Sequence, residues 1–77
     1  MDVTNGVTLL LVEKFGVTRP AVEQEAALYA LGLDSLALEE LRLLIEERWQ
    51  IDLEDVRLTS RETVGQLITA VQSKVPE

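Results

Sequence analysis

The chain has 77 residues, of which 47% are hydrophobic and 27% are charged, a balance typical of a small folded domain. Its 14 acidic and 7 basic residues give a net charge of −7, which disfavours binding to nucleic acid or to an anionic membrane surface. The sequence has no cysteine and no histidine, which excludes disulfides, Cys/His zinc sites and nucleophile–histidine catalysis.

We expect a single domain over residues 1–77, because a chain this short supports only one modest core. No apolar run approaches the length of a membrane span or a signal-peptide core, so we expect a cytoplasmic protein. The acidic surface would attract basic patches on protein partners, although solubility alone is the simpler explanation of the charge.

The first predicted helix covers residues 3–15 and is followed by Gly16, a natural stop. Gly6 lies inside it, at a cost of about 1 kcal/mol relative to alanine. Apolar residues at helical spacing predict one buried stripe. They are Val3, Val7, Leu10, Leu11 and Phe15.

A long connection follows over residues 17–33, and its middle part is compatible with a turn of helix. We expect Leu28, Leu31 and Leu33 to anchor this connection on the core. A connection this long in a small domain usually has a function of its own.

The second predicted helix runs from Ser35 to about Arg48, with Asp34 as its N-cap. One apolar stripe is spaced three, four and four residues apart and predicts a buried face. Its members are Leu38, Leu41, Ile45 and Trp49. The glutamates of this helix lie largely outside the stripe.

The last part of the chain predicts a short helical turn near residues 54–58 and a final helix. The final helix begins at Thr59 or Thr63, because both fit the reciprocal capping pattern, and it ends near Lys74. Its predicted apolar face is Val64, Leu67, Ile68 and Val71. No segment reads as a strand. We therefore predict an all-α fold, a small antiparallel four-helix bundle with a short third helix and a long loop between helices one and two.

Ser35 lies at the start of the second helix, and its role has two interpretations. In the first, Ser35 is only the helix cap, because a serine oxygen can accept from an orphan backbone N–H. In the second, Asp34 is the cap, and the Ser35 hydroxyl is free and points outward beside an uncrowded Gly32. A hydroxyl at a helix N-terminus suits a phosphate ester, since backbone N–H groups and the helix dipole favour an anion.

The segment Leu31-Gly32-Leu33-Asp34-Ser35-Leu36 resembles the 4′-phosphopantetheine attachment motif of the acyl carrier proteins and the related peptidyl carrier proteins. The resemblance extends from about residue 3 to residue 72. The matching positions outside the motif are Val3, Val7, Leu10, Leu11, Phe15, Gly16, Val17, Leu41, Ile45, Glu46, Glu47, Trp49, Thr63 and Val64.

The resemblance implies a carrier that catalyses nothing itself. A phosphopantetheinyl transferase would move the arm from coenzyme A to the Ser35 hydroxyl, and the terminal thiol would hold an acyl or aminoacyl group as a thioester. Asp34 would cap the helix and take part in recognition by the transferase. An imported thiol also accounts for the missing cysteine. We expect a monomer. We also expect no metal site, because no calcium-loop spacing is present.

The resemblance also implies that loading, condensing and tailoring enzymes dock on the second helix through basic patches. Acidic residues and exposed apolar residues of that helix form the predicted docking set. Its members are Leu36, Glu39, Glu40, Leu43, Glu46 and Glu47, together with Asp34.

Several positions depart from the pattern of fatty-acid carriers. Ala37-Leu38-Glu39 stands where those carriers have Asp-Thr-Val, Arg42 replaces an apolar residue, and Arg48-Trp49-Gln50 replaces a more acidic corner. These differences favour a specialised polyketide or nonribosomal-peptide type of pathway over fatty-acid synthesis.

Two other classes of function compete with the carrier. One is an acidic helical interaction module in which Ser35 is never modified. The other is an enzyme, which has weak support, because the paired glutamates look like exposed helix positions and not like a buried acid/base pair.

Overall fold

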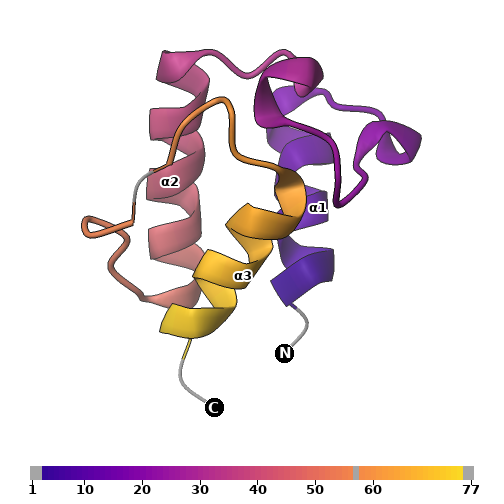
Figure 1. Cartoon of the computed structure of the whole chain (residues 1–77). Coiled ribbons are helices and arrows are strands. Elements are labelled where there is room, and N and C mark those ends of the chain that lie inside the picture. The colour runs from indigo at the N-terminus through magenta and orange to yellow at the C-terminus, as the bar shows by residue number, and fades with distance from the viewer. Residues whose placement is uncertain (1–2, 57, 76–77) are drawn as a thin grey trace.

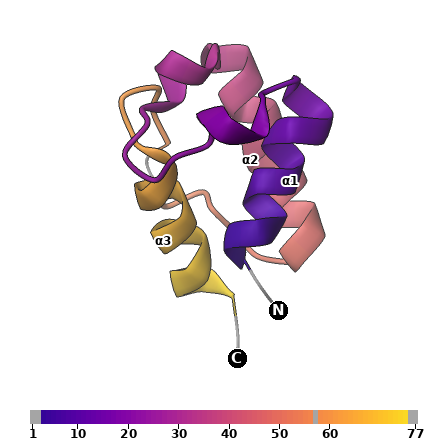
Figure 2. The same ribbon diagram turned by 90° about the vertical axis from the view of Figure 1, so that its right-hand side faces the viewer.

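The computed structural model describes residues 3–56 and 58–75. Its α-helices are α1 (Val3–Phe15), α2 (Ser35–Trp49) and α3 (Val64–Lys74), and two 3-10 turns, η1 (Arg19–Ala21) and η2 (Leu28–Leu31), lie between α1 and α2. α1 and α2 run in opposite directions, and α3 crosses them obliquely (Figure 1 and Figure 2). The long loop predicted between the first two helices is confirmed.

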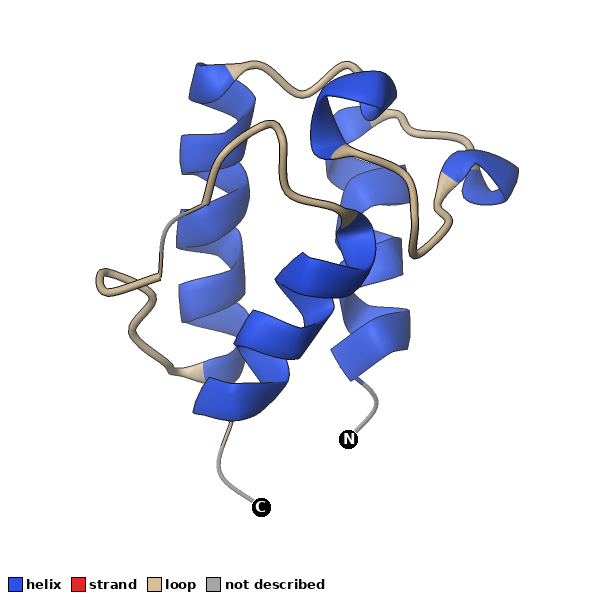
Figure 3. Cartoon of the chain, in the orientation of Figure 1, coloured by secondary structure: helices blue, strands red, loops and turns tan. Residues whose placement is uncertain are grey.

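The described part of the chain is all-helical, as predicted, and has no β-strand (Figure 3). An isolated antiparallel bridge joins Ala27 to Thr63. The short helix expected near residues 54–58 is absent from the described residues, and residue 57 lies outside them. A turn occurs there instead, in which the Val56 N–H donates to the Leu53 carbonyl at 3.0 Å. Residues 3–56 and 58–75 therefore contain three α-helices, and the four-helix arrangement stays a prediction.

Most of the core comes from the helix stripes that the sequence predicts. On α1, Val3, Val7 and Leu11 are buried, while Leu10 and Phe15 pack at the edge of the core. The predicted stripe of α2 and the predicted face of α3 are buried throughout: Leu38, Leu41, Ile45, Trp49, Val64, Leu67, Ile68 and Val71.

Gly6 has a packing role that explains its place inside a helix. A Cβ atom at this position would lie 2.5 Å from Cζ2 of Trp49, closer than real side-chain contacts allow. The indole ring thus packs directly against the α1 backbone. The lower helix propensity of glycine is offset by this close approach of α1 and α2.

The two alternative starts of the final helix are resolved in favour of Thr63. Its hydroxyl accepts from the Gln66 N–H at 3.1 Å, and the Gln66 side-chain oxygen accepts from the Thr63 N–H at 2.8 Å. This reciprocal pair is a complete capping box. Thr59 instead forms a turn, in which its carbonyl accepts from the Glu62 N–H.

The long connection before α2 is fixed to the segment before α3 by backbone hydrogen bonds. The N–H groups of Leu28 and Tyr29 donate to the carbonyls of Glu62 and Ser60, both at 2.9 Å. The predicted anchors are confirmed, since Leu28 and Leu33 are buried and Leu31 packs against the core. The chain that leads to Ser35 is therefore held both by hydrogen bonds to the segment before α3 and by leucines packed on the core.

Candidate functional site

The start of α2 decides between the two interpretations of Ser35. Asp34 has an extended backbone, and its Oδ1 atom accepts from the Ala37 N–H at 2.8 Å. Asp34 is therefore the N-cap, and Ser35 is the first residue of the helix. The interpretation of Ser35 as the cap is wrong.

The Ser35 hydroxyl is available for chemistry. Ser35 is exposed, and within the described residues its hydroxyl takes part in no hydrogen bond. It lies at the positive end of the α2 dipole, beside the N–H groups of the first turn. An anion joined to this oxygen would be stabilised by both features.

Gly32 sets the direction in which the chain enters α2. Its φ angle is +82°, in the left-handed region, and its N–H donates to the Tyr29 carbonyl at 3.0 Å. A Cβ atom at Gly32 would have nothing within 4 Å, so the requirement is conformational and not one of space. The prediction that the chain around Gly32 is uncrowded is confirmed. Gly32 forms a defined turn between η2 and the buried Leu33.

Three stripes of α2 have three different environments. Residues three or four apart on a helix share a face. The first stripe is the buried one already described. We call the second the outer stripe, made of Leu36, Glu40, Leu43 and Glu47. We call the third the groove stripe, made of Ser35, Glu39, Arg42 and Glu46.

The outer stripe alternates apolar and acidic side chains, and all four are exposed. Leu36 is 80% exposed and Leu43 is 55% exposed. Glu40 and Glu47 form no ion pair with the described residues. This stripe is free to contact another molecule.

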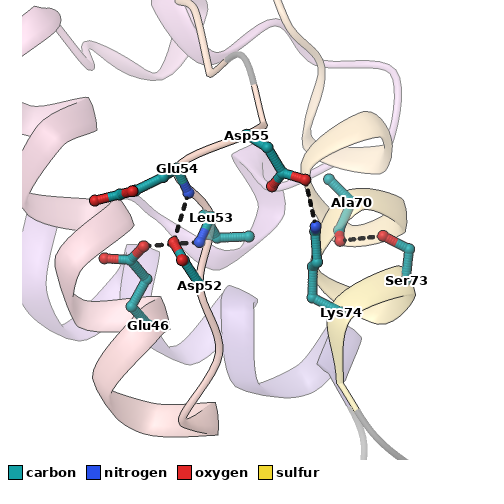
Figure 4. A network of polar contacts seen from close by, with 8 residues as sticks. All are labelled: Glu46, Asp52, Leu53, Glu54, Asp55, Ala70, Ser73 and Lys74. Atoms are coloured by element: carbon teal, nitrogen blue, oxygen red, sulfur yellow. Dashed lines mark hydrogen bonds and ion pairs between the residues drawn. The ribbon is translucent and has the colours of Figure 1, made fainter.

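The three charged residues of the groove stripe form bonds within the molecule. Arg42 forms a hydrogen-bonded ion pair with Glu39, which raises the pKa of Arg42, while partial burial opposes that shift. The Glu46 carboxylate accepts from the Leu53 N–H at 2.7 Å and ties the following loop to α2 (Figure 4). The structure thus divides the four predicted docking glutamates into two pairs, with Glu39 and Glu46 bonded within the molecule and Glu40 and Glu47 without such a bond.

A groove of about 510 Å³ lies between the groove stripe and the chain that precedes α3. Ser35 is part of its wall, so the groove is continuous with the candidate site. Its lining mixes apolar side chains with hydroxyl and charged groups: Ser35, Leu38, Glu39, Arg42, Glu54, Val56, Leu58, Thr59 and Ser60.

The loop wall of this groove is fastened by carboxylates and by one buried leucine. Leu53 is 1% exposed, and Asp52 accepts from the Glu54 N–H at 2.8 Å. Lys74 of α3 donates to Asp55 at 2.7 Å (Figure 4), and this hydrogen bond lowers the pKa of the Asp55 carboxyl. The wall is therefore tied to both α2 and α3.

Sequence reasoning missed two residues of this region. Glu54 lies in the groove wall, and no local pattern marks it because the groove forms between distant segments. Tyr29 is 64% exposed on η2, and its backbone is bonded to Ser60 in the groove wall. The sequence signal available for Tyr29 was its position as an aromatic residue in a long connection.

In the described ranges, no cluster of three or more acidic side chains is placed to hold a metal ion. The helices described there are also too short or too polar to cross a membrane.

Comparisons with known proteins identify a family. The family described as "Phosphopantetheine attachment site" matches residues 5–71 of the chain. An acyl carrier protein from Chlamydia felis (strain Fe/C-56) is 28% identical over 78 aligned positions that cover the whole of both chains. No solved structure gives a significant match.

Proposed function

The chain belongs to the phosphopantetheine-attachment family of acyl carrier proteins, and from this premise we propose that Ser35 is the residue that carries the arm. The observation that carries the proposal is the free, exposed Ser35 hydroxyl at the start of α2, where Asp34 supplies the cap. When bound, the arm supplies a thiol that holds an acyl or aminoacyl group as a thioester.

The residues around Ser35 fit this group. The Ser35 oxygen attacks the phosphorus next to the pantetheine of coenzyme A, the pyrophosphate bond breaks, and the nucleotide leaves with the bond electrons. The hydroxyl proton passes to a base of the transferase. The phosphodiester would be held at the helix N-terminus, where the N–H groups of the first turn and the helix dipole would stabilise its charge.

We propose that partner enzymes dock on the outer stripe. Basic patches on a transferase or a loading, condensing or tailoring enzyme would pair with Glu40 and Glu47, and their apolar surface would cover Leu36 and Leu43. Asp34 is exposed and adds a carboxylate beside the reacting serine. Glu39 and Glu46 contribute less to docking in this proposal, because each already has a partner within the chain.

The finer parts of the function are also proposals. Ala37, Arg42 and the Arg48-Trp49 corner support a specialised pathway of the polyketide or nonribosomal-peptide type. We take residues 1–77 as one carrier domain that works as a cytoplasmic monomer and has no enzymatic activity of its own. A four-helix bundle stays part of the proposal, although residues 54–56 form a turn in the structure.

Intact mass measurement tests the attachment. The folded protein is incubated with coenzyme A and a promiscuous phosphopantetheinyl transferase, beside the variants Ser35→Ala and Ser73→Ala. We expect the wild type and Ser73→Ala to gain one phosphopantetheine and Ser35→Ala to gain none. Ser73 is a matched control, since its hydroxyl is bonded to the Ala70 carbonyl on α3. No gain with several transferases would contradict the proposal and favour an unmodified interaction module.

A further inference from the structure

We propose that Arg42 is a specificity-determining residue for docking, because its guanidinium group makes the groove stripe unavailable to partner enzymes and leaves the outer stripe as their contact. The inference rests on the docking on α2 proposed above, and it adds which enzymes can dock there. A partner must bring its cations to Glu40 and Glu47. A partner whose cations lie over the groove stripe is excluded.

Arg42 is the basic residue of the groove stripe, and it lies among carboxylates. It forms an ion pair with Glu39, and its side chain is 23% exposed while that of Glu39 is 56% exposed. Glu54 is part of the lining of the same groove. The hydrogen bond to Glu39 raises the pKa of this guanidinium most, and the negative charges of Glu46 and Glu54 act in the same direction. A fixed positive charge therefore lies within the acidic surface of α2.

This positive charge changes what a partner meets on the groove stripe. The Glu39 carboxylate is already paired, so a partner cation gains less there than at an unpaired carboxylate. Glu46 is also engaged, because it accepts from the Leu53 N–H. A cation placed over this stripe would approach the guanidinium of Arg42, and like charges brought together in an interface disfavour the partner that brings them. The groove stripe therefore acts against such partners.

The outer stripe has the complementary pattern. It contains no basic residue, and Glu40 and Glu47 form no ion pair with the described residues. Their positions on α2 give a separation of about 10 Å along the helix axis. Leu43 lies between them and is exposed. The partner that fits this stripe presents two cations at the same separation, with an apolar side chain between them.

A double-mutant cycle tests whether Arg42 masks Glu39. The KM of a promiscuous phosphopantetheinyl transferase for the carrier is measured for the wild type, Glu39→Gln, Arg42→Gln and the double variant. We expect Glu39→Gln to change the KM by less than about twofold when Arg42 is present. When Arg42 is replaced, Glu39→Gln should raise the KM by about two- to fivefold, the range of one exposed ion pair, with kcat unchanged. An equal effect of Glu39→Gln in both backgrounds would overturn the proposal.

Arg48→Gln is the matched control, because it removes one positive charge from the same helix. Arg48 is exposed, its guanidinium carbon lies 5.4 Å from the centre of the Trp49 ring, and it forms no ion pair with the described residues. Both arginine variants increase the net negative charge equally, so both should lower the KM through long-range attraction. Only Arg42→Gln should make the KM depend on Glu39. The same dependence in the Arg48→Gln background would overturn the role of Arg42.

A charged paramagnetic probe gives a measurement that needs no transferase. Relaxation of the backbone amide protons of ¹⁵N-labelled protein by a cationic nitroxide is compared with relaxation by a neutral nitroxide of the same size. We expect Arg42→Gln to raise the ratio of the two effects at Glu39 by about twofold, the low end of the range for one exposed ion pair. Arg48→Gln should leave this ratio nearer to the wild-type value. Equal ratios for the two variants would overturn the proposal, and the same spectra show whether each variant is folded.

Failure of the proposed function would give different results. An unchanged KM for Glu47→Ala would contradict docking on the outer stripe, and the absence of any mass gain would contradict attachment at Ser35. In both cases the charged probe still shows whether Arg42 masks Glu39. Failure of this inference and failure of the proposed function are therefore distinguishable.

Discussion

The two connections that flank α2 are fastened to the bundle in different ways. Residues 16–34 are held mainly by backbone hydrogen bonds, such as those from Leu28 and Tyr29 to the segment before α3, and by buried leucines. The first half of residues 50–63 has one buried leucine, Leu53, and is otherwise held by carboxylates, through Glu46 and Asp55.

Because of this difference, the segment that positions Ser35 and the segment that forms the groove wall should respond differently to pH and salt. Backbone hydrogen bonds do not depend on side-chain charge, so the approach to Ser35 should be insensitive to pH and to salt. Hydrogen bonds and ion pairs of exposed carboxylates depend on both. The wall of the groove is therefore the part of the molecule that conditions and substitutions can adjust. Three predictions test this division.

The largest effect is expected for Gly32→Ala, compared with Gly16→Ala. Both glycines have a left-handed backbone, with φ angles of +82° and +70°, and alanine is disfavoured there by about 1–2 kcal/mol. We expect both variants to lose a similar free energy of unfolding in denaturant titrations. Only Gly32→Ala should slow the attachment of phosphopantetheine, because only Gly32 directs the chain into α2.

The comparison of these two variants has a clear contrary result. If the two modify at the same rate despite equal destabilisation, the turn at Gly32 does not position the serine. The first connection would then contribute stability alone.

The second prediction separates neighbouring glutamates of α2. Glu46→Ala removes the acceptor for the Leu53 N–H, and we expect it to lower the free energy of unfolding by about 1 kcal/mol. Glu47→Ala removes only an exposed charge, so its effect on unfolding should stay within about 0.5 kcal/mol. Denaturant titrations of both variants measure this difference.

Docking should show the opposite order for the same pair. We expect Glu47→Ala to raise the KM of the transferase for the carrier by about two- to fivefold, the range of one exposed ion pair. Glu46→Gln, which keeps an acceptor oxygen, should leave the KM near the wild-type value. A larger KM change for Glu46→Gln than for Glu47→Ala would place docking on the groove stripe instead of the outer stripe.

The sequence predicted those features that depend on residues close together in the chain. The buried stripes, the Asp34 cap and the Thr63 capping box all arise from spacings of three or four residues, which a helix makes regular. The predicted anchors Leu28 and Leu33 were found for a similar reason, since few apolar residues in that connection could reach a core.

Contacts between distant residues left no such signal. Tyr29 bonds to Ser60 across 31 positions, and Lys74 reaches Asp55 across 19. In the sequence, Glu46 resembles the other glutamates of α2, but in the structure its carboxylate accepts from the Leu53 N–H. The groove is formed by two segments that no periodicity relates, so neither its position nor the place of Glu54 in it was predictable.

The smallest effect is expected from the ion pair between Asp55 and Lys74, and it should depend on pH. The hydrogen bond from Lys74 lowers the pKa of Asp55 in the folded state. The folded protein then binds this proton less readily than the unfolded chain, in which an aspartate titrates near about 3.9. The pair therefore adds stability above that pH and loses it as the pH falls through the folded-state pKa.

Denaturant titrations of the wild type and Asp55→Asn from neutral to acidic pH measure this contribution. We expect the wild type to be slightly more stable at neutral pH, and the two proteins to converge in acid and in high salt, because Asp55 is exposed. A difference that persists in acid would mean that Asp55 holds the loop through its shape and not its charge. The groove wall would then be as insensitive to pH as the connection before Ser35, and the proposed difference between the two segments would be wrong.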